Sequence, residues 1–429
     1  MLFAAVFGGL IVRQFVGRGP SVWLILLVGA LLTLATGVLP LGQVGPVFTT
    51  TGPVLLFLLA MFLFAGALEE AGALDHLARW IVGRAHRSGD LPAALFLGFG
   101  LISAFVVNDA LVLVGVPVLI SVARRLRTEA LPLLLVLAFS VTVGSTLLPF
   151  ANPQNLLISV ESGVNAPVEV FLRYLLLPTA INLALGAWFL RRVLGAKMRP
   201  GPSPASVVPE DAPHLFPRGN WGRRLARAPV LAIFPVTLGL ITVLGIAVAF
   251  VPAAAIPIWE PAMAGAILML LLGPGRIAVL KRVNWTLLVL FAALFLVVAG
   301  AVYGGVVAAL ETALPLPGPS NPTAALVAIF GTSTVGPQFV SNVPWVAIQI
   351  PVFQSAGYGA GTPVPWMALA AASTLAGNVT LLGAPSNLII ADLAEKGGVP
   401  IRLGTFARYG LPLAALTLAV TFGCLYFGL

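Results

Sequence analysis

Twelve apolar segments fill most of this chain, and they constrain its fold more than any other feature. They lie near residues 2–17, 21–39, 51–73, 92–123, 131–158, 168–194, 228–250, 255–273, 285–309, 324–355, 366–390 and 405–428. Most have the roughly 20 residues that a helix needs to cross a bilayer. Hydrophobic residues make up 59% of the chain and charged residues only 9%, which lies outside the balance of soluble domains. The sequence therefore predicts an all-α polytopic membrane protein.

Two of these segments, 92–123 and 324–355, are too long for one crossing and have polar centres. The centres are Asn108-Asp109 and Ser341-Asn342. We interpret each segment as a re-entrant hairpin that enters and leaves the membrane on the same side.

The segments 131–158 and 366–390 share a different interruption. The two motifs are Ala151-Asn152-Pro153-Gln154-Asn155-Leu156 and Gly383-Ala384-Pro385-Ser386-Asn387-Leu388. Proline and asparagine both disfavour an unbroken helix. Broken helices in matching halves of a chain indicate a transport site.

The spacing of these features predicts two inverted-topology repeats. The interval from Gly66 to Asn108 equals that from Gly300 to Asn342, at 42 residues. With one hairpin each, both halves have about five crossings, and an odd number inverts the second copy. We expect a first repeat at 1–200, a proline-rich cytoplasmic linker at 201–227 and a second repeat at 228–429.

Charge fixes the expected orientation. With the N-terminus outside, 22 of the 23 Lys and Arg residues fall on the cytoplasmic side and only Arg173 falls outside, as the positive-inside rule requires. Both termini are then external in a plasma membrane, the inner membrane of a bacterium. The net charge of +9 needs no nucleic-acid partner to explain it; membrane lipid is the expected surrounding.

The hairpin tips and broken helices supply the candidate binding residues. Half-helix N-termini suit an anion, and freed carbonyl groups suit a cation. The candidates are Asn108, Asp109, Ser145, Thr146, Asn152, Gln154, Asn155, Ser341, Asn342, Ser373, Thr374, Asn378, Thr380, Ser386 and Asn387. Sodium, if it is the coupling ion, is expected at Asn108, Asn155, Asn342 and Asn387. Each residue taken alone could equally be a helix-packing residue.

Asp109 is the only carboxylate that we place near the membrane centre. A charge there costs at least about 2.5–3.5 kcal/mol on insertion scales, so such residues are usually functional. We predict that Asp109 couples transport to an ion, and the alternative is a helix cap. Val343 occupies the equivalent position, so a carboxylate-bound ion or proton belongs in the first half.

Other chemistry has little support in the sequence. His76, His86, His214 and Cys424 show no metal-ligand spacing, and we expect no catalytic residue, metal or cofactor beyond the coupling ion, H+ or Na+. No Walker motif is present, so energy must come from an ion gradient or a partner subunit. Glu69 and Glu70 lie near Asp75 and Arg79, where solvated ion pairing is the expected role.

The motifs at Asn108-Asp109, Asn152 to Leu156, Ser341-Asn342 and Pro385 to Leu388 resemble those of the ArsB/NhaD ion-transporter superfamily, also called citrate-transporter-like. Within it the chain is most similar to the anion permeases. The resemblance implies a homodimeric secondary active transporter with an elevator-like motion, which moves a small inorganic or organic anion or oxyanion with protons or sodium.

The hairpin tips leave other transport modes open. In the dicarboxylate and citrate members, Ser-Asn-Thr tips hold sodium and the substrate carboxylate, whereas here the tips are Asn108-Asp109 and Ser341-Asn342. The first pair is similar to that of the arsenite exporters. Arsenite or antimonite efflux by proton antiport, with an ATPase partner only in that case, is the main alternative. A Na+/H+ antiporter and a channel are further alternatives.

Overall fold

The fold was taken from a computed structural model of the chain. It describes residues 21–73, 90–198, 221–247, 256–273, 275–313 and 315–428, with a few positions before residue 13 and between 76 and 83. Every regular element within these ranges is helical. The longer elements of the first half are α2 (Val22–Ala35), α3 (Val44–Glu70), α5 (Leu91–Ser103), α6 (Asn108–Leu126), α7 (Ala130–Gly144), α8 (Pro153–Glu161) and α9 (Pro167–Leu194).

The second half begins with α10 (Trp221–Ala247), so residues 221–227 of the expected linker are helical, and 201–220 lie outside the described residues. The remaining elements are α11 (Trp259–Leu272), α12 (Arg276–Arg282), α13 (Trp285–Tyr303), α14 (Val306–Ala313), α15 (Pro322–Val335), α16 (Pro337–Val340), α17 (Asn342–Ser355), α18 (Pro363–Leu375), α19 (Pro385–Lys396) and α20 (Leu403–Phe427). Short 3-10 turns are η1 (Leu41–Gln43), η2 (Gly195–Met198), η4 (Ala376–Asn378) and η5 (Leu381–Gly383).

Six helical segments among the described residues are long and apolar enough to cross a membrane. They are Leu41–Glu70, Pro167–Met198, Val230–Ala247, Trp285–Tyr303, Pro322–Val340 and Leu403–Phe427. The all-α membrane architecture expected from hydropathy is therefore confirmed. The hairpin segments divide where their polar centres predict, with α6 and α17 beginning at Asn108 and Asn342.

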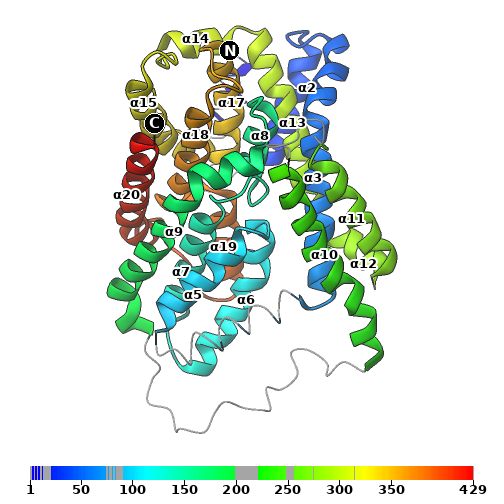
Figure 1. The fold of residues 1–429 in the computed structure, drawn as a ribbon, viewed down its shortest axis with the longest axis vertical. Helices are drawn as coiled ribbons and strands as arrows, with labels where there is room; N and C mark the ends of the chain where they lie inside the picture. The colour runs from blue at the N-terminus through cyan, green and yellow to red at the C-terminus, as the bar shows by residue number, and fades with distance from the viewer. Residues whose placement is uncertain are drawn as a thin grey trace.

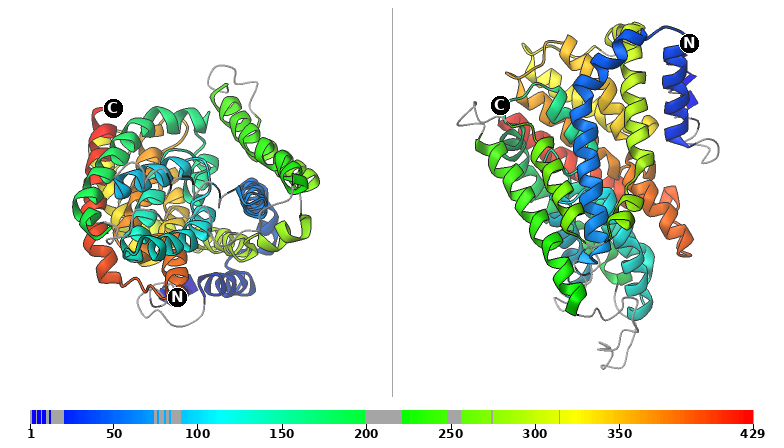
Figure 2. Two further views of the ribbon diagram at one scale, coloured as in Figure 1. Left: turned by 90° about the horizontal axis from the view of Figure 1, so that it is seen from below. Right: turned by 90° about the vertical axis from the view of Figure 1, so that its right-hand side faces the viewer.

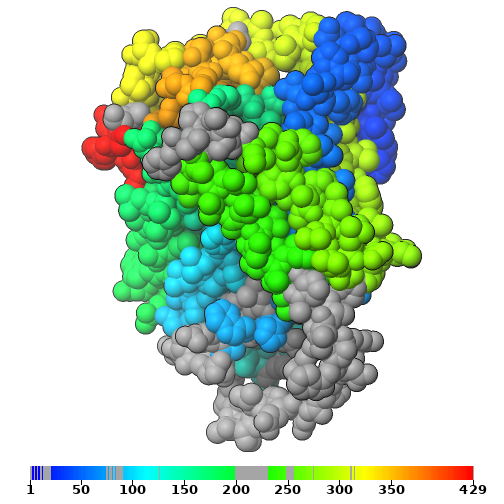
Figure 3. Space-filling view, turned by 45° about the vertical axis from the view of Figure 1, so that its right-hand side comes forward, coloured from blue at the N-terminus to red at the C-terminus, as the bar shows by residue number. Residues whose placement is uncertain are grey.

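The helices form two groups, each drawing on both halves of the chain. In one, the α3 group, α2 packs on α13 and α3 packs on α10, α11, α12 and α13. In the other, the α7 group, α5, α6, α7 and α9 pack with one another, α8 packs on α17 and α18, and α15 to α20 complete the group. Figures 1 and 2 show the two groups beside each other, and Figure 3 shows α10 and α11 on the face of the α3 group.

Helix α7 forms the centre of its group because it is apolar on every side. Every residue from Pro132 to Gly144 is buried, as expected of a helix without a polar face. At its end, a Cβ on Gly144 would lie only 1.8 Å from the carbonyl oxygen of Gly100 on α5. The hydroxyl of Ser103 also donates to the carbonyl of Val141 at 3.0 Å. Close contact between α5 and α7 thus positions the first hairpin against the first broken helix.

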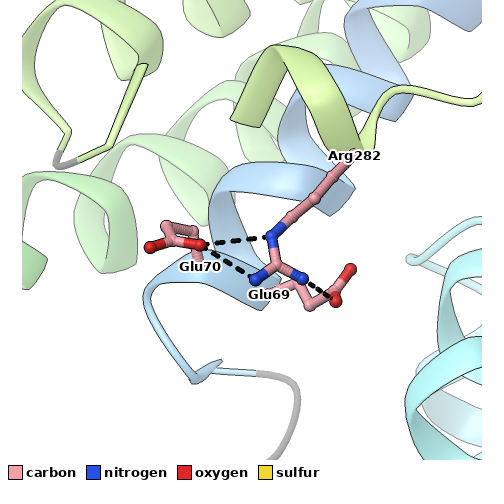
Figure 4. A network of polar contacts seen from close by, with 3 residues as sticks. All are labelled: Glu69, Glu70 and Arg282. Carbon is pink, nitrogen blue, oxygen red and sulfur yellow. Dashed lines mark hydrogen bonds and ion pairs between the residues drawn. The ribbon is translucent and has the colours of Figure 1, made fainter. Parts of the chain in front are cut away.

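An arginine ties the two halves together within the α3 group (Figure 4). Arg282, which ends α12, forms ion pairs with Glu69 and Glu70 at the end of α3, and its Nη2 lies 3.0 Å from Glu70 Oε2. Asp75 and Arg79, near which the sequence placed these glutamates, lie outside the described residues. Both glutamates thus have an ion-pair partner from the other half of the chain.

Candidate transport site

The first helix break, between α7 and α8, is held by the side chains of its own asparagines. Asn152 is the N-cap of α8, and its Oδ1 accepts from the backbone N–H of Asn155 at 2.8 Å. Its Nδ2 donates to the carbonyl of Ser145 at 2.8 Å. Asn155 points the same way, with Nδ2 within 3.2–3.4 Å of the carbonyls of Ser145, Thr146 and Leu148. Carbonyls freed at membrane depth need such partners.

The second break, between α18 and α19, repeats this arrangement. Asn387 Nδ2 donates to the carbonyl of Gly377 at 2.6 Å, ten residues back. Asn155 reaches Ser145 across the same offset of ten residues. The two motifs that recur in the sequence therefore make the same bond in each half, which gives the recurrence a physical reason.

Thr374, on α18, connects the two breaks. Its Oγ1 accepts from Gln154 Nε2 at 3.1 Å and from Asn152 Nδ2 at 3.4 Å. It also lies 3.4 Å from Asn155 Oδ1, to which it can donate. One buried hydroxyl of the second half thus contacts three amide side chains of the first half, so a shift of either break disturbs the other.

The first hairpin tip rests on the first break. The backbone N–H of Asn108 donates to the carbonyl of Ala151 at 3.3 Å, and Asn108 Oδ1 accepts from the N–H of Asp109 at 2.9 Å. Asp109 is 5% exposed. Its carboxylate has no hydrogen bond or ion pair within the described part of the chain, and the side chain that satisfies a first-turn N–H of α6 is that of Asn108. The helix-cap alternative for Asp109 is therefore not what the structure contains.

The second hairpin tip is strained and bonded to the second break. Ser341 has φ 70° and ψ 161°, a conformation that glycine adopts easily and other residues do not. Three residues earlier, Gln338 donates to the carbonyl of Ala376 at 2.9 Å, and its Oε1 accepts from Thr380 Oγ1 at 2.7 Å. Gln338 was not among the expected site residues, although an amide beside a polar tip was a usable signal.

A group of unpartnered polar atoms lies at the second break and the second hairpin of the described chain. Within the described residues, no hydrogen bond is found for these buried atoms: Asn342 Oδ1, both side-chain polar atoms of Asn378, Ser386 Oγ and Asn387 Oδ1. Each of these four residues is at most 2% exposed. Buried polar atoms are nearly always paired, so unpaired ones call for an explanation such as a bound ligand or ion.

The expected residues are enclosed, but they do not all face the same way. Fourteen of the fifteen are buried, and Thr380 is half-buried. The hydroxyls of Ser145, Thr146 and Ser373 donate to carbonyls of their own helices, which is a packing role. A cavity of about 380 Å³ between α3, α8 and α11 is lined by other residues, among them Phe57 and Trp259. In the part of the chain that the structure covers, no three His, Cys, Asp or Glu side chains come together as metal ligands.

Comparison with known proteins places this arrangement among transporters. A family model described as "Citrate transporter" matches residues 15–376. The chain is 27% identical to the 46 kDa membrane protein of Mycobacterium leprae, over 86% of this chain and 84% of that protein. It is 28% identical to an uncharacterized transporter of Mycobacterium tuberculosis, with the same coverage. It is also 23% identical to the silicon efflux transporter LSI3 of Oryza sativa, over 86% and 85% of the two chains.

The fold has a counterpart among solved structures. The crystal structure of the YdaH transporter of Alcanivorax borkumensis, which has an unusual topology, matches with a TM-score of 0.60 and 17% identity. The match covers 89% of this chain and 86% of that one. At this level of identity the likeness concerns the arrangement of the helices.

Proposed function

We propose that this chain, which belongs to the citrate transporter family of the ArsB/NhaD superfamily, is a secondary active transporter of a small anion or oxyanion. That it is a membrane transporter follows from the family and from the transporters among its relatives. Its substrate, its coupling ion and its mechanism are what we propose here.

The observation that carries the proposal is the set of unpartnered polar atoms at the second break and second hairpin. Neither side-chain polar atom of Asn378 has a hydrogen-bond partner among the described residues, and the same holds for the hydroxyl of Ser386. The two residues can therefore offer an N–H donor and an O–H donor to an oxyanion. Asn342 and Asn387 offer side-chain oxygens, which suit a small cation such as sodium or a hydroxyl of the substrate. Pro385 begins α19 beside them, so the positive end of that helix favours negative charge.

Asp109 supplies the coupling in this proposal. Its carboxylate is enclosed and unpaired, so it is free to take up a proton or a cation. Keeping an isolated charge at this depth is costly, and a bound proton or sodium ion removes that cost. Transport would then proceed most readily when Asp109 is neutralised, which links substrate movement to the ion gradient.

The two groups of helices suggest how the site moves. The α3 group would form a dimeric scaffold, while the α7 group, which holds both hairpins and both breaks, would slide past it as an elevator. The shared ten-residue asparagine bond supports two inverted repeats. We place both termini outside a plasma membrane and the basic loops in the cytoplasm.

A second candidate is efflux of an uncharged hydroxide by proton antiport. The specific observation is that none of the fifteen expected residues, nor Gln338, is cationic. Amide and hydroxyl side chains can bind an uncharged hydroxide such as undissociated arsenite through hydrogen bonds alone. The rice relative bears the name of a silicon efflux transporter, and silicic acid is also a neutral hydroxide at physiological pH.

Reconstitution in liposomes tests both candidates. We expect gradient-dependent accumulation of one solute from a panel of phosphate, sulfate, citrate, succinate, arsenite and silicic acid, under imposed proton or sodium gradients. In Asp109→Asn, substrate exchange should persist while its dependence on the gradient is lost. Glu260→Gln, which removes an exposed carboxylate at the start of α11, serves as the control. Undiminished gradient-driven uptake by Asp109→Asn would refute the coupling role.

A further inference from the structure

Two cations share one aromatic ring where α9 ends and α20 begins. Lys197, in the turn η2 that follows α9, donates from Nζ to the hydroxyl of Tyr409 at 3.1 Å, and its Nζ lies 5.7 Å from the centre of the tyrosine ring. The guanidinium of Arg408 lies 5.9 Å from the same centre. Both cations are exposed.

Among the described residues, no acidic side chain forms an ion pair with either of these two cations. Within the described ranges, ion pairs join Arg191 to Asp90, Arg282 to Glu69 and Glu70, and Lys396 to Asp392. The hydroxyl of Thr128 donates to the backbone carbonyl of Lys197, and the neighbouring Glu129 makes no ion pair there. Each cation lies within 6 Å of the centre of the Tyr409 ring, so an anion that contacted both would gain from two positive charges.

The surroundings identify the anion as a lipid headgroup. Helices α9 and α20 are both long enough to span a membrane and pack side by side (Figure 1). Trp188, six residues before the end of α9, is 52% exposed, with the guanidinium of Arg192 lying 5.3 Å from the centre of its ring. Exposed tryptophan and tyrosine at helix ends are typical of the headgroup level.

The helix surface next to the cations is apolar. Leu411, three residues after Arg408 and therefore on the same face of α20, is 56% exposed. A phosphate between Lys197 and Arg408 would thus leave its acyl chains against Leu411, whereas a free phosphate ion gains nothing from that contact. We propose that Lys197, Arg408 and Tyr409 bind the phosphate of an anionic phospholipid, with Trp188 and Arg192 at the edge of the site.

Lipid binding to the purified full chain in neutral detergent tests this site. Native mass spectrometry with phosphatidylglycerol, phosphatidylcholine or inorganic phosphate measures the binding of each. A cation near an anionic lipid surface contributes about fivefold in affinity, so the double variant Lys197→Ala/Arg408→Ala should bind phosphatidylglycerol about 25-fold more weakly. The matched control Arg276→Ala/Lys281→Ala removes two exposed charges from α12 and should change binding less than about twofold.

The outcomes separate the proposal from its rivals. Unchanged preference for phosphatidylglycerol in the double variant would overturn the site. Displacement of the lipid by millimolar inorganic phosphate would reassign it to a free anion and also overturn the lipid assignment. If the alanine variant does not fold, the charge-preserving exchange Lys197→Arg/Arg408→Lys should retain binding and Lys197→Gln/Arg408→Gln should lose it. Equal binding by those two variants would likewise refute the proposal.

Discussion

Replacing Gly410 with alanine should disable the proposed site, because the added methyl group would collide with the backbone of Asn378. Gly410 lies inside α20, where a Cβ would sit 2.0 Å from the carbonyl oxygen of Asn378 and 3.1 Å from the ring of Phe139. Real Cβ atoms essentially never come within 3.0 Å of such an atom, so α20 or the turn η4 must move by at least 1 Å. Asn378 carries two of the unpartnered atoms of the proposed site.

The size of the effect follows from two opposing terms. Alanine stabilises a helix interior by about 1 kcal/mol relative to glycine, whereas forcing extra atoms into a packed interior usually costs about 1–3 kcal/mol. The contact here is with backbone, which cannot change rotamer, so the cost should lie at the upper end. We expect Gly410→Ala to lower the free energy of unfolding by about 1–2 kcal/mol net. A 1 Å displacement of aligned groups can cost about 100-fold in an active site, and we expect transport to fall by at least about tenfold.

Gly423→Ala is the matched control, because it places the same methyl group in the same helix with nothing within 4 Å. It should transport at the wild-type rate and unfold at the same or a higher temperature. Both variants are compared by initial uptake rate in liposomes and by thermal unfolding in detergent. If Gly410→Ala matches Gly423→Ala in both assays, α20 does not constrain the second break and the reasoning fails.

Three further outcomes are expected. Ser386→Ala should reduce transport at least about tenfold, because the Ser386 hydroxyl has no partner among the described residues and is available to a ligand. Ser373→Ala should transport at nearly the wild-type rate in the same vesicles, because the Ser373 hydroxyl donates to the carbonyl of Leu369 on its own helix. Equal effects of the two substitutions would contradict the site. Ser341→Gly should raise thermal stability by about 1 kcal/mol by relieving the positive φ, and a lower unfolding temperature would count against strain at the tip. Burial raises the pKa of Glu161 above its ordinary value of 4.5, so the folded state holds its proton more tightly than the unfolded chain does, and stability falls as pH rises from 4.5 through the raised pKa. Glu161→Gln should flatten this part of the stability profile, and an identical slope in the variant would exclude Glu161 as its source.

Local features of the sequence predicted the architecture well. Hydropathy identified the helical membrane protein, and the polar centres at Asn108 and Asn342 coincide with the starts of α6 and α17. The prolines at 153 and 385 begin α8 and α19 as the broken-helix interpretation requires. These helix starts depend on residues close together in the chain, because a local run of apolar residues forms a helix and a proline or asparagine interrupts it.

Contacts between distant residues could not be predicted in this way. Sequence proximity placed Glu69 and Glu70 near Asp75 and Arg79, which lie outside the described residues, but gave no sign of Arg282, an ion-pair partner more than 200 residues away. The candidate list likewise grouped the amides and hydroxyls of both breaks, with only Asp109 distinguishing the first half from the second. In the structure the first break satisfies its own carbonyls with Asn152 and Asn155, while several amide and hydroxyl atoms at the second break and second hairpin have no partner among the described residues. Which amide faces its own backbone and which faces a ligand depends on the packing of all four elements.

The pairing of α2 with α13 sets the order in which a nascent chain can assemble. The end of α2 at residue 35 and the start of α13 at residue 285 are separated by 250 residues. At about 5–20 residues per second, a ribosome needs roughly 12–50 s to synthesise that interval. During this time the newly inserted α2 has no native partner from the second half. Glu69 and Glu70 at the end of α3 wait for Arg282 over a shorter interval of 212–213 residues. Biogenesis must therefore keep the early spans unassociated, which makes slow translation or a membrane chaperone a direct influence on the yield of folded protein.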